Sequence, residues 1–403
     1  MIKVADFIIN TLAERGIDKM FVVYGAANGD LIDAFTRTAA TQYVAVMHEQ
    51  AGGFAAEAYA KVKGIPGVAI ATSGPGGMNL LTSMGNCFYD SIPCVFLTGQ
   101  INSRFLRPDP SIRQIGFQET DIVAMASPVT KYAKMILNPE DVRFELEKAL
   151  WMCQEGRPGP VLLDIPLNVQ KAMVDAKQLT GFEPPAAMSF DLTVVDQQIA
   201  RFISDLQQAE RPVILVGGGV RLADAQDDVR ALGRRLNVPC FPTWNALDVI
   251  SSDYENYGGR VGTYGGAGRN FGIQNSDLLL SIGSRISGRI TGGNVQSFAR
   301  QAKKYLVEID PAMVQRKFQQ VPFDVNILCD AKAFTQRVLI ALDRRSKPLP
   351  DFSAWTGRVM EWKRRYDPVR PEFFAQRERV HPYAFMRRLS EKMGATDVLV
   401  GDC

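Results

Sequence analysis

The sequence predicts an α/β protein with two doubly wound parallel-sheet domains and the beginning of a third. Two observations carry this prediction. In residues 44–79, the apolar run Val44–Met47 leads into a helical segment and then into a second apolar run, Val68–Ala71. In residues 211–219, another apolar run ends in three consecutive glycines. Strands that alternate with helices in this way form parallel sheets.

Length and composition narrow the class of protein. At 403 residues, with 46% apolar and 22% charged residues, the chain suits two or three soluble domains. The net charge of +3, without a basic run, argues against nucleic-acid binding. No stretch reaches the roughly 18 apolar residues of a membrane span and no signal peptide is present, so we expect a cytoplasmic protein. Six scattered cysteines without a C-x-x-C pair and only two histidines argue against a structural zinc site.

The first domain is expected over residues 1–180. It opens with an amphipathic helix over Met1–Arg15. A second helix is predicted between the two apolar runs named above, because apolar residues recur there at helical spacing: Ala51, Phe54, Ala55, Ala58, Tyr59 and Val62. The predicted strands are Met20–Val23, Val44–Met47, Val68–Ala71, Cys94–Thr98 and Val161–Asp164.

A linker over Gly181–Met188 leads to the second domain, residues 190–345. A helix over Val194–Gln208 is expected to precede a sheet of about six strands. Five of these are predicted, and they are residues 211–216, Cys240–Pro242, Asp277–Gly283, Tyr305–Ile309 and Asn326–Cys329.

Residues 346–380 are predicted to be an extended connector with helical parts. Residues 381–403 are predicted to begin a third, incomplete domain. We expect a helix there from Pro382 to about Lys392, a strand at Val398–Val400, and the end of the chain at Gly401-Asp402-Cys403.

Glu49 and the glycine-rich turn Ser73–Gly77 both follow predicted strands, so both should lie at the carboxyl edge of the first sheet, where open α/β folds bind ligands. Gly52-Gly53 in the helix would each cost about 1 kcal/mol relative to alanine, which suggests that something approaches the helix closely. The alternative is that Glu49 only stabilises the first turn of a helix and that the glycines only form a turn.

Together these residues resemble the pyrimidine-binding domain of thiamine-diphosphate enzymes of the acetolactate synthase family. The resemblance lies in His48-Glu49-Gln50, in residues 72–76 (Thr-Ser-Gly-Pro-Gly) and in Asn79. It implies that Glu49 hydrogen-bonds N1′ of the cofactor's aminopyrimidine ring, with Pro75 and Asn79 against the same ring. The cofactor itself carries the difficult step of the reaction.

A similar Phe-Gln-Glu-x-Asp lines the substrate pocket of that family. The resemblance implies that Gln118 touches the cofactor, that Phe117 packs on substrate carbon, and that Lys131, in a similar Thr-Lys pair, attracts a carboxylate. The alternatives are an ordinary core phenylalanine, a surface glutamine and a solvated lysine.

Two departures from the family fall near the mouth of this pocket. Tyr24 stands where the family has a proline before its glycine, here Gly25. The loop over residues 101–116 is several residues longer and contains Arg104, Arg107 and Arg113. Both departures leave the acceptor substrate open.

The FAD-binding members of the family hold a G-x-R-x-x-x-R-x-T-G similar to residues 283–292. Arginines suit a dinucleotide's pyrophosphate. The implied FAD contacts are Gly217, Gly218, Gly219, Thr243, Gly283, Ser284, Arg285, Arg289, Glu308 and Ile309. Against FAD, Ser287-Gly288 replaces two acidic residues, the glycine triplet lacks G-x-G-x-x-G spacing, and members that have lost the flavin keep the same fold.

The cofactor's diphosphate needs a divalent cation held by oxygen ligands. In the family this site is a G-D-G with a later asparagine, beyond the strand expected at Val398–Val400, and the sequence contains no G-D-G. The resemblance therefore implies that the chain carries about two of the family's three domains. The chain is then either a fragment, or one component of an enzyme whose remaining domain is a separate polypeptide.

The expected function is that of the larger component of a split acetolactate synthase-like enzyme. It would decarboxylate a 2-oxo acid, with pyruvate as the expected donor, and transfer the acyl unit to an acceptor carbonyl. A partner chain would hold the diphosphate and Mg²⁺ in a hetero-oligomer, a dimer of heterodimers. The alternatives are a decarboxylase or lyase without carboligation and a non-catalytic flavin-binding scaffold, which would have no need of Glu49 and Gln118.

Overall fold

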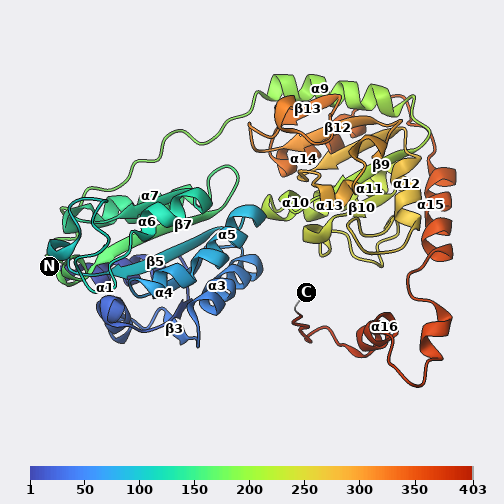
Figure 1. The fold of residues 1–403 in the computed structure, drawn as a ribbon. Helices are drawn as coiled ribbons and strands as arrows, with labels where there is room; N and C mark the ends of the chain where they lie inside the picture. The colour runs from blue at the N-terminus through green and yellow to red at the C-terminus, as the bar shows by residue number, and fades with distance from the viewer. Residues whose placement is uncertain (402–403) are drawn as a thin grey trace. The chain divides into compact units, whose positions relative to one another are not determined.

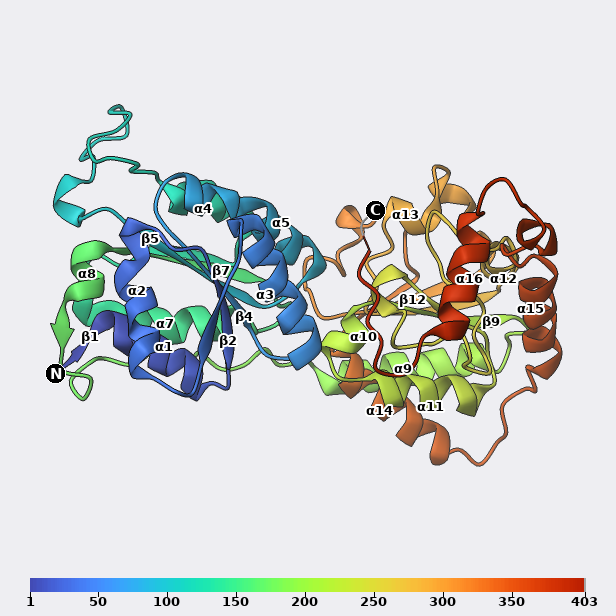
Figure 2. The same ribbon diagram turned by 90° about the horizontal axis from the view of Figure 1, so that it is seen from below.

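The computed structural model describes residues 1–401 and contains two compact units, Met1–Ser189 and the chain from Phe190 onward. Each unit is built on its own parallel sheet flanked by helices (Figures 1 and 2). The expected linker over residues 181–188 contains no helix or strand. The predicted α/β class is confirmed.

The first unit contains a six-stranded parallel sheet in the order β3-β2-β4-β5-β7-β6. Its strands are β2 (Lys19–Val22), β3 (Gln42–Ala45), β4 (Gly67–Ala71), β5 (Cys94–Gln100), β6 (Tyr132–Met135) and β7 (Pro160–Pro166). Its helices are α1 (Val4–Glu14), α2 (Gly29–Asp33), α3 (Glu49–Lys63), α4 (Pro75–Asn79), α5 (Leu81–Asp90), α6 (Ile122–Ala126), α7 (Val142–Met152) and α8 (Leu167–Lys171). A short antiparallel pair joins β1 (Ile2–Lys3) to β8 (Met173–Val174).

Alternate residues of each strand serve two separate cores, because successive side chains point to opposite faces of a sheet. Val68 and Ile70 of β4 pack in the core that includes α1 and α7. Ala69 and Ala71 pack in the core that includes α3, α5 and α6. The central strands β4, β5 and β7 are therefore covered on both faces, which explains why they are largely apolar runs in the sequence.

Helix α3 forms where the spacing predicts it and ends at Gly64, whose left-handed backbone (φ +72°) caps it. Its buried face is not the predicted apolar stripe: Phe54 and Val62 of that stripe are 39% and 81% exposed. The buried face instead consists of small residues and one carboxylate, namely Gly52, Gly53, Ala56, Glu57 and Ala60. A Cβ on Gly53 would lie 1.9 Å from Ser83 Oγ of α5, so this glycine permits close packing of two helices.

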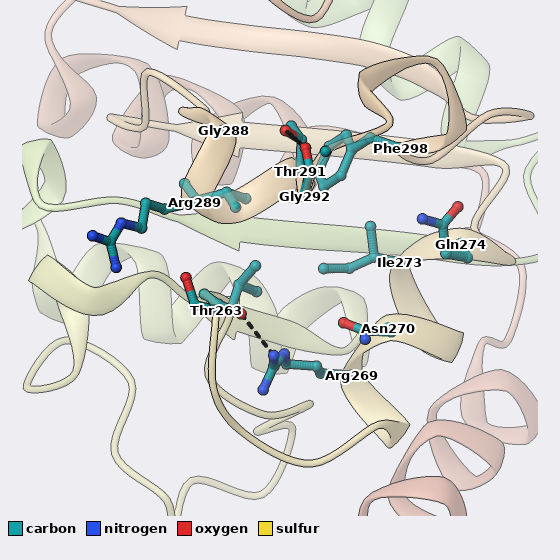
Figure 3. A pocket seen from close by; sticks show the side chains of 14 residues that line it. Thr263, Arg269, Asn270, Ile273, Gln274, Gly288, Arg289, Thr291, Gly292 and Phe298 are labelled. Atoms are coloured by element: carbon teal, nitrogen blue, oxygen red, sulfur yellow. Dashed lines mark hydrogen bonds between the residues drawn. The ribbon is translucent and has the colours of Figure 1, made fainter.

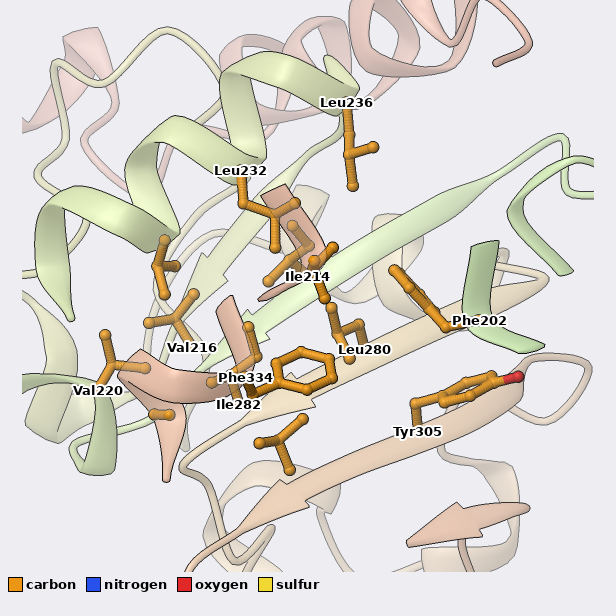
Figure 4. Close-up of a cluster of buried hydrophobic side chains, with 14 of the residues drawn as sticks. Phe202, Ile214, Val216, Val220, Leu232, Leu236, Leu280, Ile282, Tyr305 and Phe334 are labelled. Atoms are coloured by element: carbon orange, nitrogen blue, oxygen red, sulfur yellow. The ribbon is translucent and has the colours of Figure 1, made fainter. Parts of the chain in front are cut away.

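The second unit contains a five-stranded parallel sheet in the order β10-β9-β11-β12-β13, one strand fewer than expected. Its strands are β9 (Pro212–Val216), β10 (Cys240–Pro242), β11 (Leu278–Ile282), β12 (Lys303–Glu308) and β13 (Val325–Leu328). Its helices are α9 (Leu192–Leu206), α10 (Gly219–Leu222), α11 (Gln226–Leu236), α12 (Gly268–Gln274), α13 (Gly288–Thr291), α14 (Ala331–Asp343), α15 (Ser353–Arg365) and α16 (Pro382–Lys392). Figure 4 shows its larger core, in which Phe202, Tyr305 and Phe334 meet strand residues such as Ile214.

The predicted connector has the expected helical part, α15 over Ser353–Arg365, but this helix packs into the second unit and is not extended. Trp355 is buried and its Nε1 donates a hydrogen bond to the carbonyl of Pro212, 3.1 Å away, at the start of β9. Gly268 of α12 lies so close to α15 that a Cβ would stand 2.6 Å from the backbone of Trp362. Trp355 and Val359 of α15 therefore belong to the core on one face of the second sheet.

Helix α16 forms as predicted, but Val398–Val400 is not a strand. These three side chains are 84%, 53% and 88% exposed. A strand needs a neighbour to pair its backbone groups, and this segment pairs with no strand of residues 1–401. Asp402 and Cys403 lie outside the described residues.

The five cysteines within residues 1–401 are buried free thiols. They are Cys87, Cys94, Cys153, Cys240 and Cys329. No helix of this described part is long and apolar enough to cross a membrane. The same residues contain no group of three or more His, Cys, Asp or Glu side chains placed to hold a metal ion.

Candidate active site at two topological switch points

The first unit has a topological switch between β2 and β4. The chain passes from β2 to β3 on one side and then to β4 on the other, so the turns after β2 and β4 meet at the carboxyl edge. There Thr72 Oγ1 accepts a hydrogen bond from the backbone N–H of Ala27 at 3.2 Å. A Cβ on Gly25 would lie 2.5 Å from Thr72, so only glycine fits. Open α/β sheets bind ligands at such points.

Glu49 is the first residue of α3, and residues 46–48 separate it from the end of β3. His48 caps this helix, because its Nδ1 accepts the backbone N–H of Gln50 at 3.1 Å. Asn79 Nδ2 donates to Glu49 Oε2 at 2.8 Å, which ties the carboxylate to the end of α4. The other oxygen, Oε1, would lie 3.4 Å from a Cβ on Gly76. The carboxylate is therefore held beside the glycine-rich turn.

The glycine-rich turn also meets the segment that carries Gln118. Gly74 has a left-handed backbone (φ +62°), and a Cβ on it would lie 2.8 Å from the carbonyl oxygen of Gln118 and 2.9 Å from its Cβ. Pro75 follows as the first residue of α4, where its missing N–H costs nothing. The structure thus brings Glu49, Asn79, Pro75 and Gln118 together from three chain segments.

We expect Gly74→Ala to destabilise the first unit by about 2–4 kcal/mol, because alanine resists a left-handed backbone and its methyl group would collide with Gln118. Gly85→Ala is the matched control, since Gly85 lies inside α5 with open space around its Cβ position and should gain helix stability. Denaturant unfolding of both variants measures the difference. Equal stability of the two would contradict the close approach of Gly74 to Gln118.

Phe117 and Lys131 differ in where the structure places them. Phe117 is 83% exposed and adjoins Gln118 in sequence. Lys131 precedes β6 at the amino edge of the sheet, and its Nζ donates to the carbonyl of Glu155 at 2.5 Å. Burial lowers the pKa of Lys131. The structure does not bring Lys131 to Glu49, because the carboxyl ends of parallel strands lie at the opposite edge, so the resemblance-based role of Lys131 is not supported by this geometry.

Sequence reasoning missed a buried carboxyl group behind the site. Asp164 of β7 is fully buried, and Thr98 Oγ1 and Gln100 Nε2 donate to it at 2.7 and 3.0 Å. Burial raises the pKa of Asp164 to about 7, against the lowering effect of these two hydrogen bonds. Gln100 Nε2 also donates to the carbonyl of Thr120 at 2.9 Å, two residues beyond Gln118. The available signal was a charged residue inside an apolar strand.

The second unit has its own switch point, between β9 and β11, and two glycine turns meet there. A Cβ on Gly217 would lie 2.1 Å from the carbonyl oxygen of Gly283, and one on Gly219 would lie 2.8 Å from Gly283 Cα. Gly283 has φ +60°. The residues implied as FAD contacts follow β9, β10 and β11, or lie at and just after the end of β12. They therefore share the carboxyl edge of this parallel sheet.

A pocket of about 640 Å³ adjoins this edge (Figure 3). It is formed by Val261, Gly262, Thr263, Arg269, Asn270, Ile273, Gln274, Gly288, Arg289, Ile290, Thr291, Gly292, Gly293 and Phe298. The two terminal nitrogens of Arg269 donate hydrogen bonds to the carbonyls of Tyr264 and Gly262, at 2.8 and 2.7 Å. Its Nε is buried and has no hydrogen-bond partner among the described residues. Of the ten implied FAD contacts, Arg289 lines this pocket.

Comparison with known proteins agrees with both units. The N-terminal TPP binding domain of thiamine pyrophosphate enzymes matches residues 2–125, and the central domain of these enzymes matches residues 199–338. The acetolactate synthase large subunit of Corynebacterium glutamicum is 36% identical over 367 residues, covering 90% of this chain and 56% of that protein. Acetolactate synthase 1, chloroplastic, of Nicotiana tabacum is 32% identical over 366 residues, covering 90% and 53%. The chain spans about half the length of the curated relatives it matches.

Proposed function

Because the chain belongs to the thiamine pyrophosphate enzymes, whose N-terminal and central domains it carries, we propose that it is the larger component of a split acetolactate synthase-like enzyme. The proposed reaction decarboxylates a 2-oxo acid, with pyruvate as the first donor to test, and transfers the acyl unit to an acceptor carbonyl. The observation that carries the proposal is the meeting of Glu49, Asn79 and Gln118 at one glycine-rich turn.

The residues present fit the aminopyrimidine end of thiamine diphosphate. Asn79 holds one oxygen of Glu49, and Gly76 leaves the space beside the other oxygen free of a side chain. We propose that Glu49 Oε1 accepts a hydrogen bond from the protonated N1′ position and that Gln118 contacts the cofactor from the facing segment. When bound, thiamine diphosphate supplies the nucleophile and the electron sink for decarboxylation of a 2-oxo acid.

We propose that a separate chain supplies the domain that binds the diphosphate and Mg²⁺, in a dimer of heterodimers. The chain covers 56% of the Corynebacterium glutamicum relative, and the exposed apolar side chains of Val398–Val400 are suited to pairing with a strand of such a partner.

The test mixes this chain with a candidate partner bearing a G-D-G motif, together with thiamine diphosphate, Mg²⁺ and a series of 2-oxo acids. We expect CO₂ release only when both chains are present. Activity of either chain alone would contradict the split enzyme, and no CO₂ from any 2-oxo acid would overturn the catalytic proposal. Product analysis separates carboligation from the alternative, because a simple decarboxylase releases an aldehyde. The largely exposed, arginine-containing loop over residues 101–116 is the reason for testing the simple decarboxylase as the alternative.

We further propose that the second unit binds FAD at its switch point, with Arg289 near the pyrophosphate. Charge-assisted hydrogen bonds contribute about 1.5–3 kcal/mol, so Arg289→Ala should weaken FAD binding roughly tenfold or more. Arg300→Ala removes an exposed arginine that does not line the pocket and serves as the control. Titration by flavin fluorescence measures both. Absence of flavin from the purified protein together with no binding of added FAD would contradict this part of the proposal.

A further inference from the structure

The segment that carries Gln118 is a tight turn in an unusual conformation. The backbone N–H of Glu119 donates to the carbonyl of Gly116 at 3.1 Å, which closes a turn with Gln118 at its third position. Gln118 has a left-handed backbone (φ +59°). That position of such a turn normally requires glycine or asparagine, so a glutamine there must be held by its surroundings.

The carboxylate of Glu119 supplies this hold from the neighbouring position. It is 9% exposed. Its Oε2 accepts the backbone N–H groups of Ile115 and Gly116 at 3.0 and 3.2 Å, and its Oε1 accepts that of Arg107 at 2.6 Å. The two oxygens therefore clamp together parts of the 101–116 loop that are far apart along its length.

The charge of Glu119 is maintained by the same contacts. Burial raises the pKa of Glu119, whereas the three backbone donors and the nearby Arg107 lower it, and the net effect is a lowered pKa. The group is thus an ionised acceptor at neutral pH, and a carboxylate that accepts several N–H groups holds a backbone conformation firmly.

We propose that Glu119 is a positioning residue that folds the 101–116 loop and holds Gln118 in its left-handed conformation, facing the glycine-rich turn beside Glu49. The catalytic consequence rests on the proposed function, but the conformational consequence does not. Two contacts locate the turn from other sides: Gly74 abuts Gln118, and Gln100 donates to the carbonyl of Thr120. Within the loop, Arg107 Nη1 also donates to the carbonyl of Ile112 at 3.0 Å, and its Nη2 lies 3.7 Å from Asp121 Oδ2. The carboxylate of Glu119 is the group that binds the backbone of Arg107 and that of residues 115–116 at the same time.

Glu119→Gln tests the clamp with little change of shape, because one acceptor oxygen becomes an NH₂ group that faces N–H donors. Asp109→Asn is the matched control: Asp109 lies in the same loop and is exposed, and its Oδ1 accepts the backbone N–H of Ser111 at 2.7 Å. Hydrogen exchange and trypsin cleavage at Arg104 and Arg113 are measured on the full chain without cofactor. We expect about tenfold faster exchange in peptides spanning residues 106–119 and faster cleavage for Glu119→Gln only. Unchanged exchange and cleavage would overturn the proposal whatever the enzyme does.

The catalytic arm uses the chain with its partner, thiamine diphosphate and Mg²⁺. We expect Glu119→Gln to lower kcat about tenfold or more in the wild-type background and to have little further effect in a Gln118→Ala background, because the two residues act through one another. Full additivity of the two substitutions would show that Glu119 does not act through Gln118. An inactive wild-type mixture would contradict the proposed function instead, and the exchange result would still decide the clamp.

Discussion

Glu49→Gln is expected to reduce CO₂ release by about two to four orders of magnitude, while the protein keeps its fold and its affinity for the partner chain. Glutamine has nearly the same shape and can still accept the hydrogen bond from Asn79 that the carboxylate accepts at 2.8 Å. It cannot provide the negative charge that would stabilise a protonated N1′ position of the cofactor. The measurement is single-turnover decarboxylation with the partner chain, thiamine diphosphate and Mg²⁺ at saturating concentration.

The competing explanation of Glu49 is that its charge only favours the N-terminus of α3. In that case Glu49→Gln would cost about 0.3–1 kcal/mol of stability and little activity. Glu140→Gln provides the control, because Glu140 is an exposed glutamate just before α7 and undergoes the same loss of charge at a helix start. Equal activity of the two variants would remove Glu49 from catalysis.

Much of the fold was predictable because the central strands of both sheets are buried on both faces, so these strands are plain apolar runs. Strand β6 (Tyr132–Met135) was not predicted, because it lies at an edge of the sheet and contains Lys134. An edge strand does not need a continuous apolar run. The buried face of α3 was predicted wrongly because the prediction followed the spacing of large apolar residues. The residues that are buried are mostly small, such as Gly53, and allow α5 to approach closely.

The candidate site divides in a similar way. The proximity of Glu49, Asn79 and Gln118 was expected from a resemblance between short motifs, and these residues meet in the structure. The support behind them depends on register between strands that are far apart in sequence. Thr98 lies opposite Asp164 only because β5 pairs with β7 across 66 residues. No local pattern contains that pairing, so the buried network was not predictable.

Asp164 makes the stability of the first unit depend on pH near neutrality. Its pKa is about 7 in the folded chain, chiefly through burial and further through the charge of Asp121, against about 3.9 when unfolded. Between these values the folded state holds a proton that the unfolded state releases, so the contribution of Asp164 to stability is greatest below about pH 4 and falls as the pH rises to 7. Three pKa units correspond to a loss of up to about 4 kcal/mol.

Asp164→Asn should remove this slope, since asparagine does not titrate but can still accept from Gln100 and donate to Thr98, whose hydroxyl can reverse its role. We therefore expect the variant to be less stable than or similar to the wild type at pH 5 and clearly more stable at pH 8. Hydrogen exchange of β5 and β7 under denaturant at both pH values isolates the first unit from the second. A parallel pH dependence in the two proteins would show that the carboxyl is already ionised in the folded state.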